Sequence, residues 1–566
     1  MSFHATTVDP GVFRRAVAII DQPWATEIDH ALTAPTGRPR AHTPSTILTL
    51  LAITTLETGE AILTQAANVS VRLSVQQKTR IGLEGSVDFR YISRTVKDIA
   101  NALDPGIDAD TGEISEPRLL TPPTELWSRI ISGVIPSRFP ATSTQAIDST
   151  DIEVYSRRRS WSKDGRPDDD AGALPEESVA LPDEKKRRSE PGWPKVGADG
   201  RFQNSIDPDA RDGYRSGKNG APKGVFIGFD DHLSVDVAPC GGEHVPALAR
   251  GMSIAPAGDS KTDAGIALIE ALQKLGVAVD EVAVDRGYSY GTTEKWAERL
   301  ADCGVTQVFD LHTNQRGMSP GPDPRMIYID GALFSAAIPA QQRKLPGFRI
   351  GMTADEKTEL TGQYDDRAAY AFRPMGGPDL ARRTQRYRGP ALAGTVRCPN
   401  VPESMRLPVH RRPLTPCTPG EECGCGATVT LGPEDQLRSR QKHLYGTRKW
   451  NESYGRRNAV ESANSLIHDT RAKLTRGAIR VRGLHKHGLL TALIVAGVNI
   501  ALMYSVYGYD AGNPCEDSVT LVARVPKKQA LHRKPRVFQR PHRGPRDKTE
   551  PAPTPGTLNG WESATS

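Results

Sequence analysis

The sequence predicts an α/β protein whose core is a mixed sheet flanked by helices. Three observations predict it. Residues 224–310 alternate strand-like and helix-like segments, which is the order that builds a layered α/β domain. Residues 1–135 carry helical patterns instead, and residues 312–439 are loop-rich and interrupt the alternation before a helical pattern resumes. We therefore expect an N-terminal helical region, a core in two pieces, and an insertion between those pieces.

The helical N-terminal region is predicted over residues 1–135. An apolar run at Thr46–Leu56 follows a proline, which is favoured at helix starts. A second helical stretch, Ile92–Leu103, is closed by a Pro-Gly pair. The segment Gly37–Arg40 precedes both and is typical of a basic loop.

The core is predicted over residues 140–311 and 440–507. Its strands are expected at Gln145–Asp148, Gly224–Ala238, Glu281–Asp285 and Gly304–Asp310, and its helices at Thr262–Leu275, at Thr292–Ala301 and from about 453 to about 507. Residues 156–222 are rich in Arg, Asp, Gly and Pro, which is typical of a long loop. The tail, residues 508–566, is basic, polar and proline-rich, and we expect it to be disordered.

Charge is unevenly distributed along the chain. The 73 Lys and Arg residues exceed the 67 Asp and Glu residues by only six. Residues 435–488, however, hold thirteen Lys and Arg against four Asp and Glu, a composition that favours contact with phosphate groups. The 566-residue length, with 37% apolar residues and seven cysteines, excludes collagen, a coiled coil and a disulfide miniprotein.

Two aspartates follow strand-like apolar residues. Asp148 follows Ala146 and Ile147, and Asp285 follows Val282–Val284. A carboxylate that emerges from a buried strand is held rigidly, and two adjacent strands can bring both carboxylates to one metal pair. Such oxygen ligands are those that Mg²⁺ prefers. The alternative for each aspartate is a turn former or a helix N-cap.

A polar helix face is predicted between residues 453 and 468. At about 100° per residue, one side of this helix carries Tyr454, Arg457, Glu461 and His468. The alternative is a solvated face with an Arg–Glu pair one turn apart. That alternative does not explain the Tyr and the His, and it predicts a more even charge balance. We favour a metal-ligating carboxylate beside a phosphate-binding surface.

This face carries a family resemblance. The spacing Tyr454-x2-Arg457-x3-Glu461 resembles the Y-(2)-R-(3)-E signature of the insertion-sequence-four type of DDE transposase. The family pattern continues with a lysine after six further residues, where this chain has His468. Histidine is largely uncharged at neutral pH unless its pKa is raised. Two cations that lie about one turn further on are candidates to replace that lysine: Arg471 and Lys473.

The aspartates extend the resemblance over residues 140–505. Asp285-Arg-Gly-Tyr is similar to the D-x-G-Y box around the second aspartate of that family, and Ala-Ile-Asp148-Ser-Thr looks like its first-aspartate strand. The three acids occur in the family order. The long separation between Asp285 and Glu461 fits the insertion that this family often carries there.

The resemblance implies an RNase H-like catalytic core in which Asp148, Asp285 and Glu461 hold two Mg²⁺ or Mn²⁺ ions for in-line attack on phosphodiesters. It implies a transposase that cleaves and joins the ends of its own insertion sequence. Double-stranded DNA would be the partner of a homodimer associated with the bacterial nucleoid, and residues 1–135 would help to bind it. The implied DNA contacts of the core are Tyr454, Arg457, His468, Arg471 and Lys473.

Two other functions stay open at this point. A decayed or domesticated transposase would bind DNA without cleaving it, and the intact set of three acids argues against that reading. An RNase H-like nuclease would use the same acids and would differ only in the fate of the 3′-hydroxyl. Inverted repeats beside the gene would favour the transposase.

Four cysteines cluster within the insertion. Cys398, Cys417, Cys423 and Cys425 lie within 28 residues, among glycines and prolines. Four thiolates can bind a structural Zn²⁺ tetrahedrally, although the spacing is not that of paired C-x-x-C knuckles. The alternative is a set of reduced, partly buried thiols. The odd cysteine total favours a reducing cytoplasm over a secreted disulfide framework.

One apolar stretch, residues 489–507, has about the length of a membrane span. Thr491, Gly497 and Asn499 interrupt it, and its end is polar. We therefore predict a buried core helix and no membrane partner. The N-terminus lacks a basic segment followed by an apolar one, so we expect no signal peptide.

Overall fold

A computed structural model of the chain describes residues 7–33, 39–107, 113–156, 195–196, 202–203, 205–215, 224–349, 351–379 and 381–513. The first two residues of the predicted basic loop, most of the predicted loop at 156–222 and the predicted tail from residue 514 onwards lie outside these residues.

The N-terminal region is helical, as predicted. Its helices are α1 (Pro10–Ile20), α2 (Pro23–Ala31), α3 (Pro44–Thr58), α4 (Leu63–Arg72), α5 (Val75–Arg80), α6 (Phe89–Ala102) and α7 (Pro123–Ser132), with a short hairpin of β1 (Gly106–Ile107) and β2 (Ile114–Ser115) before α7. Proline occupies the first position of four of them, α1, α2, α3 and α7. There its missing N–H leaves no helical hydrogen bond unmade.

A six-stranded mixed sheet forms the core. Its strands are β3 (Thr144–Glu153), β6 (Arg211–Arg215), β7 (Gly224–Asp236), β8 (Ala249–Pro256), β9 (Glu281–Val284) and β10 (Thr306–Val308). The order is β10-β9-β3-β7-β6, and β8 also pairs with β7. β9 and β10 extend the sheet in parallel with β3, whereas β7 runs antiparallel to β3, β6 and β8. The prediction of a mixed sheet in an α/β protein is confirmed. A separate two-stranded sheet pairs β4 (Lys195–Val196) with β5 (Phe202–Gln203).

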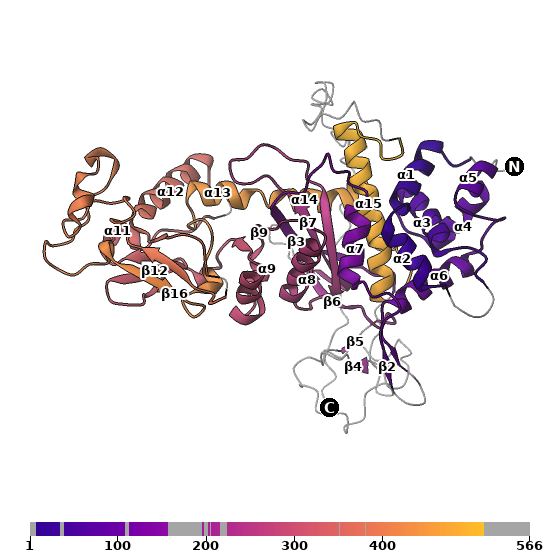
Figure 1. Ribbon diagram of the computed structural model, residues 1–566, viewed down its shortest axis with the longest axis horizontal. Coiled ribbons are helices and arrows are strands. Elements are labelled where there is room, and N and C mark those ends of the chain that lie inside the picture. The colour runs from indigo at the N-terminus through magenta and orange to yellow at the C-terminus, as the bar shows by residue number, and fades with distance from the viewer. Residues whose placement is uncertain are drawn as a thin grey trace, which may run out of the picture. The chain divides into compact units, whose positions relative to one another are not determined.

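Helices flank this sheet (Figure 1). On one face, Ile147 of β3 shares a core with Ile266 and Leu272 of α8 (Lys261–Lys274). The next residue, Asp148, points to the opposite face because side chains alternate along a strand. There α14 (Asn458–Ser465) contacts β3 and β7. The strand β9 leads into α9 (Arg286–Ser289), a π-helical turn (Thr293–Glu298) and α10 (Arg299–Asp302).

The insertion has more regular structure than the loop-rich sequence predicts. It contains two three-stranded antiparallel sheets. The first comprises β11 (Met318–Pro320), β12 (Met326–Ile329) and β13 (Ala332–Ser335), and the second comprises β14 (Arg373–Pro374), β15 (Gln385–Arg388) and β16 (Thr428–Leu431). Two helices join the sheets in sequence, α11 (Ala340–Arg343) and α12 (Ala354–Arg367).

The helical pattern predicted from about 453 to about 507 is present but divided, and residues 471–483 within it are not helical. The pieces are α13 (Arg448–Gly455), α14, a π-helical turn (Leu466–Thr470) and α15 (Leu484–Tyr507). α15 is long and apolar enough to span a membrane by length and composition, but 72% of its most apolar window is buried in the protein. It packs against α7, α3 and β8, as predicted for a core helix (Figure 1).

Candidate active site

The two aspartates singled out from the sequence lie on neighbouring parallel strands. Pairing of β3 with β9 ends at Ile147 and Val284, so Asp148 is the next residue of β3 and Asp285 is the first residue after β9. Asp148 is not at the end of its strand, as the sequence suggested, because β3 continues to Glu153 in antiparallel pairing with β7. It lies where the parallel partner stops, which leaves room for its side chain beside that of Asp285.

The turn after β9 positions Asp285. Its Oδ1 accepts a hydrogen bond of 2.7 Å from the N–H of Gly287 and caps α9, so the N-cap alternative is also realised. A Cβ on Gly287 would lie 2.9 Å from that oxygen and 3.0 Å from Cδ of Lys261, closer than ordinary contact. The following Tyr288 is fully buried, with its hydroxyl 2.8 Å from Nδ1 of His232. Each residue of the Asp-x-Gly-Tyr sequence thus has a structural role. Asp285 caps α9, Gly287 allows the close approach of Lys261, and Tyr288 packs in the core.

Arg457 connects the third acid to the first. One guanidinium nitrogen, Nη1, donates to Oδ2 of Asp148 at 2.9 Å, and the other, Nη2, donates to Oε1 of Glu461. The guanidinium also lies 5.8 Å from the ring centroid of Tyr454, and that ring stacks on Trp450. Because the helix breaks after α13, Arg457 is the N-cap residue of α14. It reaches the sheet from there while Glu461 remains half exposed.

The carboxyl of Asp148 is electrostatically strained. Burial raises its pKa to about 6, with a further rise from the charge of Asp285, while Arg457 and Lys261 act in the opposite direction. Its side chain is only 14% exposed. Burial and the neighbouring carboxylate outweigh these two cations, which is the electrostatic setting that a bound divalent cation relieves. The donor set, carboxylate oxygens on rigid elements, fits Mg²⁺.

The predicted DNA contacts are divided between two places. His468 lies in the π-helical turn after α14, with Nε2 2.8 Å from Oγ1 of Thr150 on β3, so it stays beside the acids. Arg471 instead donates to Oγ of Ser505 on α15. Lys473 is exposed, and its backbone N–H donates to the carbonyl of Gly59 at the end of α3.

Two residues of this region were not singled out from the sequence. Lys261, the first residue of α8, donates from Nζ to Oγ of Ser149 at 2.6 Å and places a cation beside the aspartates. Asp231 on β7 is fully buried opposite Thr150, and neither carboxylate oxygen has a partner among the described residues. Burial raises the pKa of Asp231 to about 8. A short strand–turn–helix signal precedes Lys261, but nothing in the local sequence marks Asp231.

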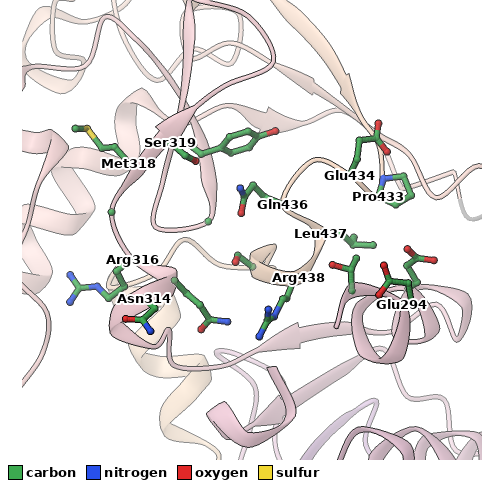
Figure 2. Close-up of a pocket in the computed structure, with 17 residues that line it drawn as sticks. Glu294, Asn314, Arg316, Met318, Ser319, Pro433, Glu434, Gln436, Leu437 and Arg438 are labelled. Atoms are coloured by element: carbon green, nitrogen blue, oxygen red, sulfur yellow. The ribbon is translucent and has the colours of Figure 1, made fainter. Parts of the chain in front are cut away.

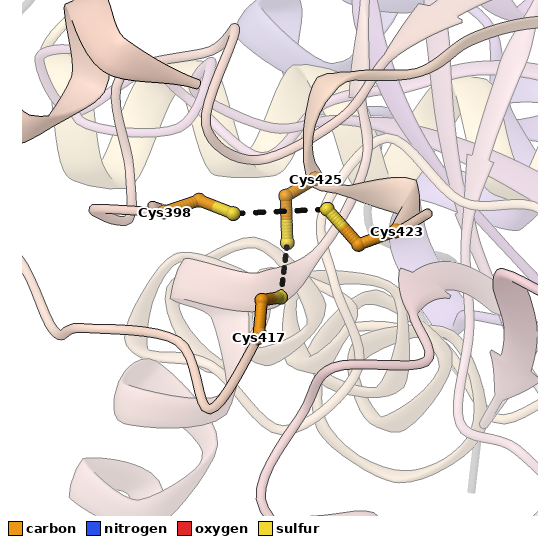
Figure 3. A group of neighbouring side chains, drawn as sticks. All are labelled: Cys398, Cys417, Cys423 and Cys425. Carbon is orange, nitrogen blue, oxygen red and sulfur yellow. Dashed lines mark hydrogen bonds between the residues drawn. The ribbon is translucent and has the colours of Figure 1, made fainter. Parts of the chain in front are cut away.

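The insertion holds a second polar cluster. Within the described residues, one group of His, Cys, Asp or Glu side chains has ligand atoms close enough together to hold a metal: Cys398, Cys417, Cys423 and Cys425, all within 4.8 Å of one another. Figure 3 shows the four thiols converging. This cluster can bind a metal such as zinc. His410, an alternative ligand by sequence, is exposed and does not belong to the group.

A polar cavity lies away from the acids. It measures about 740 Å³ and is lined by the π-helical turn after α9 and by residues 314–319 and 433–439. Figure 2 shows polar side chains around it, including Glu294, Asn314 and Arg438. Asp148, Asp285 and Glu461 are not among its lining residues. A site for a small molecule is usually enclosed, whereas a polymer can reach half-exposed acids on a surface.

Comparison of the chain with protein-family models, with curated proteins and with solved structures gives no match.

Proposed function

We propose that the chain is a DDE transposase that cleaves DNA at the ends of an insertion sequence and joins the freed 3′ ends to target DNA. The observation that carries the proposal is the placement of Asp148 beside Asp285, two acids from distant parts of the chain, with Glu461 joined to Asp148 through Arg457. Asp148 and Asp285 follow the paired ends of adjacent parallel strands. Among the described residues these three acids are not close enough together to form a ready-made metal site. The motif spacing in the sequence makes these same three acids the expected set.

The topology supports an RNase H-like core. In the sheet, β7 pairs antiparallel with β3 on one side and with β6 and β8 on the other, and β9 and β10 are added in parallel on the other side of β3. The first acid lies on the central strand, the second follows the adjacent parallel strand, and the third lies on a helix that contacts the first strand. The insertion between β10 and α13 separates the second acid from the third.

Two Mg²⁺ or Mn²⁺ ions fit the proposed chemistry. Held by Asp148, Asp285 and Glu461, they would supply activation of water or a 3′-hydroxyl and stabilisation of the leaving oxygen. Arg457 orients two of the acids, and its guanidinium is the group that would contact a DNA phosphate beside them. Lys261 adds positive charge on the other side of Asp148.

A DNA partner is supported by the charge of the C-terminal part of the core. Residues 435–488 have thirteen cations and four acids, and phosphate contacts of this kind supply most of the affinity for any DNA sequence. Tyr454, Arg457 and His468 lie beside the acids and would contact phosphates near the scissile bond. Arg471 and Lys473 would bind phosphates further away. A homodimer that brings two DNA ends together is part of the proposal, as is a nucleoid-associated location.

The test is cleavage of DNA that carries the gene's own flanking sequences, in Mg²⁺ or Mn²⁺. We expect nicking at the element boundary by the wild type, followed by joining of the 3′ end. Substitution of Asp148, Asp285 or Glu461 by Ala should lower cleavage by at least about a thousandfold while DNA binding persists. Asp280→Ala is the matched control, because this exposed residue immediately precedes β9.

The outcomes separate the alternatives. Retained cleavage by folded Asp285→Ala protein would overturn the assignment of the acids. Metal-dependent hydrolysis without joining would replace the transposase with a nuclease. DNA binding without cleavage by the wild type would identify a non-catalytic DNA-binding protein, and His468→Lys would then test whether the family lysine restores activity.

A further inference from the structure

The four clustered thiols of the insertion have the dimensions of a tetrahedral metal site. Sγ of Cys398 lies 3.7 Å from Sγ of Cys423, and Sγ of Cys417 lies 3.8 Å from Sγ of Cys425. A zinc–sulfur distance of about 2.3 Å requires sulfurs roughly 3.8 Å apart in a regular tetrahedron. The two Sγ–Sγ distances, which join different pairs of cysteines, match that value.

Disulfide bonding does not explain the cluster. A disulfide brings its sulfurs to about 2.05 Å, and each of the four cysteines is free. Cys398 and Cys425 are completely buried, and the other two are half-buried. A single free thiol can fill a place in an apolar core. Burial of apolar surface does not explain, however, why four thiols from three separate segments point at one centre.

Side chains around the cluster hold the three segments together. Asn400 donates from Nδ2 to the carbonyls of Thr418 and Glu421, at 3.0 and 2.8 Å, and its Oδ1 accepts from the N–H of Gly420. The same nitrogen lies 3.7 Å from Sγ of Cys423. One amide thus joins the turn after Cys398 to the loop that carries two of the other thiols.

A second group of contacts ties the cluster to the neighbouring sheet. Oγ of Ser335, on β13 of the first small sheet, lies 3.3 Å from Sγ of Cys425. A Cβ on Gly424 would lie 2.4 Å from the carbonyl oxygen of Arg325, so the backbones of the two segments pass very close together. Cys398 and Cys425 also belong to one apolar core with Phe334 of β13.

We propose that Cys398, Cys417, Cys423 and Cys425 bind one structural Zn²⁺ that closes the long connection between β15 and β16 and fastens it to the first small sheet. The connection runs from residue 389 to residue 427 and contains only short 3₁₀ turns as regular structure. Its apolar core is small, and small cores of this kind are commonly stabilised by a metal. Asn400 is a positioning residue that holds the ligand segments in register.

Zinc is the metal that this ligand set selects. Thiolates are soft ligands, and a closed four-sulfur site leaves no open position for water or substrate. The hard oxygen-preferring ions proposed for Asp148, Asp285 and Glu461 would not compete for it. The zinc proposal is independent of the proposed transposase activity.

The test is metal analysis of the full chain, expressed in zinc-supplemented medium and kept reduced. We expect about one zinc per chain, and X-ray absorption at the zinc edge should report four sulfurs at about 2.3 Å. Zinc-free wild-type protein, or a first shell dominated by nitrogen and oxygen, would overturn the proposal. Because this measurement uses the wild type, it does not depend on a variant that folds.

Variants then locate the site. Cys417→Ser and Cys423→Ser should each reduce bound zinc at least tenfold, whereas Cys303→Ser, a half-buried cysteine outside the cluster, should keep it. Asn400→Ala should bind zinc more weakly while all four sulfurs remain in the shell. Retention of zinc by both cluster variants would refute the ligand assignment.

Amide hydrogen exchange reports the structural role. The N–H of Arg397 is bonded to the carbonyl of Pro413, and the N–H of Thr415 to the carbonyl of Arg397. Removal of zinc should accelerate exchange of these amides at least tenfold and leave those of β3 unchanged. Unchanged exchange in the 395–427 segment after complete zinc removal would show that the metal does not hold this connection closed.

Discussion

Asp148 is a carboxylate that the fold holds in an unfavourable environment. It is buried beside Asp285, and burial raises its pKa to about 6. A folded-state pKa above the unfolded value means that the folded chain binds more protons between about pH 4 and pH 6. The free energy of unfolding therefore falls as the pH rises through this window. A shift of about two units corresponds to about 3 kcal/mol at neutral pH, and such strain is typical of functional sites.

Replacement of this carboxylate should therefore stabilise the protein. In buffer without Mg²⁺, we expect Asp148→Asn to raise the melting temperature by about 2 °C at pH 7.5, since the amide keeps an acceptor for Arg457. The gain should shrink toward pH 4, where the wild-type carboxyl is protonated. Thermal unfolding at several pH values measures it, with exposed Asp280→Asn as the control. A loss of stability at pH 7.5 would contradict the electrostatic account.

At the scale of elements, α15 combines a membrane-like composition with a buried polar residue. Asn499 accepts from the N–H of Ala249 at 3.0 Å and donates to its carbonyl at 2.9 Å. It thereby satisfies the backbone at the start of β8. In a core helix packed against a sheet, such an asparagine supplies the partner that these buried backbone groups need.

The variant Asn499→Leu tests the role of this helix. We expect it to lower the free energy of unfolding by about 2–3 kcal/mol, because both backbone groups of Ala249 lose their partner in a buried place. Thermal or urea unfolding in detergent-free buffer measures the effect, and Val506→Leu in the same helix is the control. Equal or greater stability of Asn499→Leu would mean that the contact with β8 does not fix α15.

The sequence predicts the elements that are determined by local sequence patterns, and it misses features that are determined by contacts with distant residues. The strands at β3 and β9 and the helix α8 are visible as apolar runs and periodicity, and the structure confirms them. The break between α13 and α14 is not visible, because residues 453–468 keep a helical pattern through it. There Arg456 donates to the carbonyl of Ala238 and pairs with Glu281, contacts that no local pattern contains.

At the scale of the whole molecule, composition predicts a helical region, a core in two pieces and an insertion. The structure has helices, a mixed sheet and two small sheets in that order along the chain, and the exact boundaries stay a prediction. The two small sheets of the insertion are not predicted, because their strands are two to four residues long and pair around short connections or, for β15 and β16, across the long segment 389–427. In the candidate site, the motif spacing predicts the three acids, whereas Lys261 and Asp231 are brought there only by folding.

The measurement that tests the central claim most directly is binding of Mn²⁺ followed by electron paramagnetic resonance, in the presence of a DNA duplex. Wild type is compared with the double variant Asp148→Asn/Asp285→Asn, and Asp280→Asn serves as the control. We predict that the wild type and the control each bind up to two more Mn²⁺ ions per chain than the double variant does. Equal uptake by all three proteins would contradict a metal site at these acids and, with it, the proposed DNA chemistry.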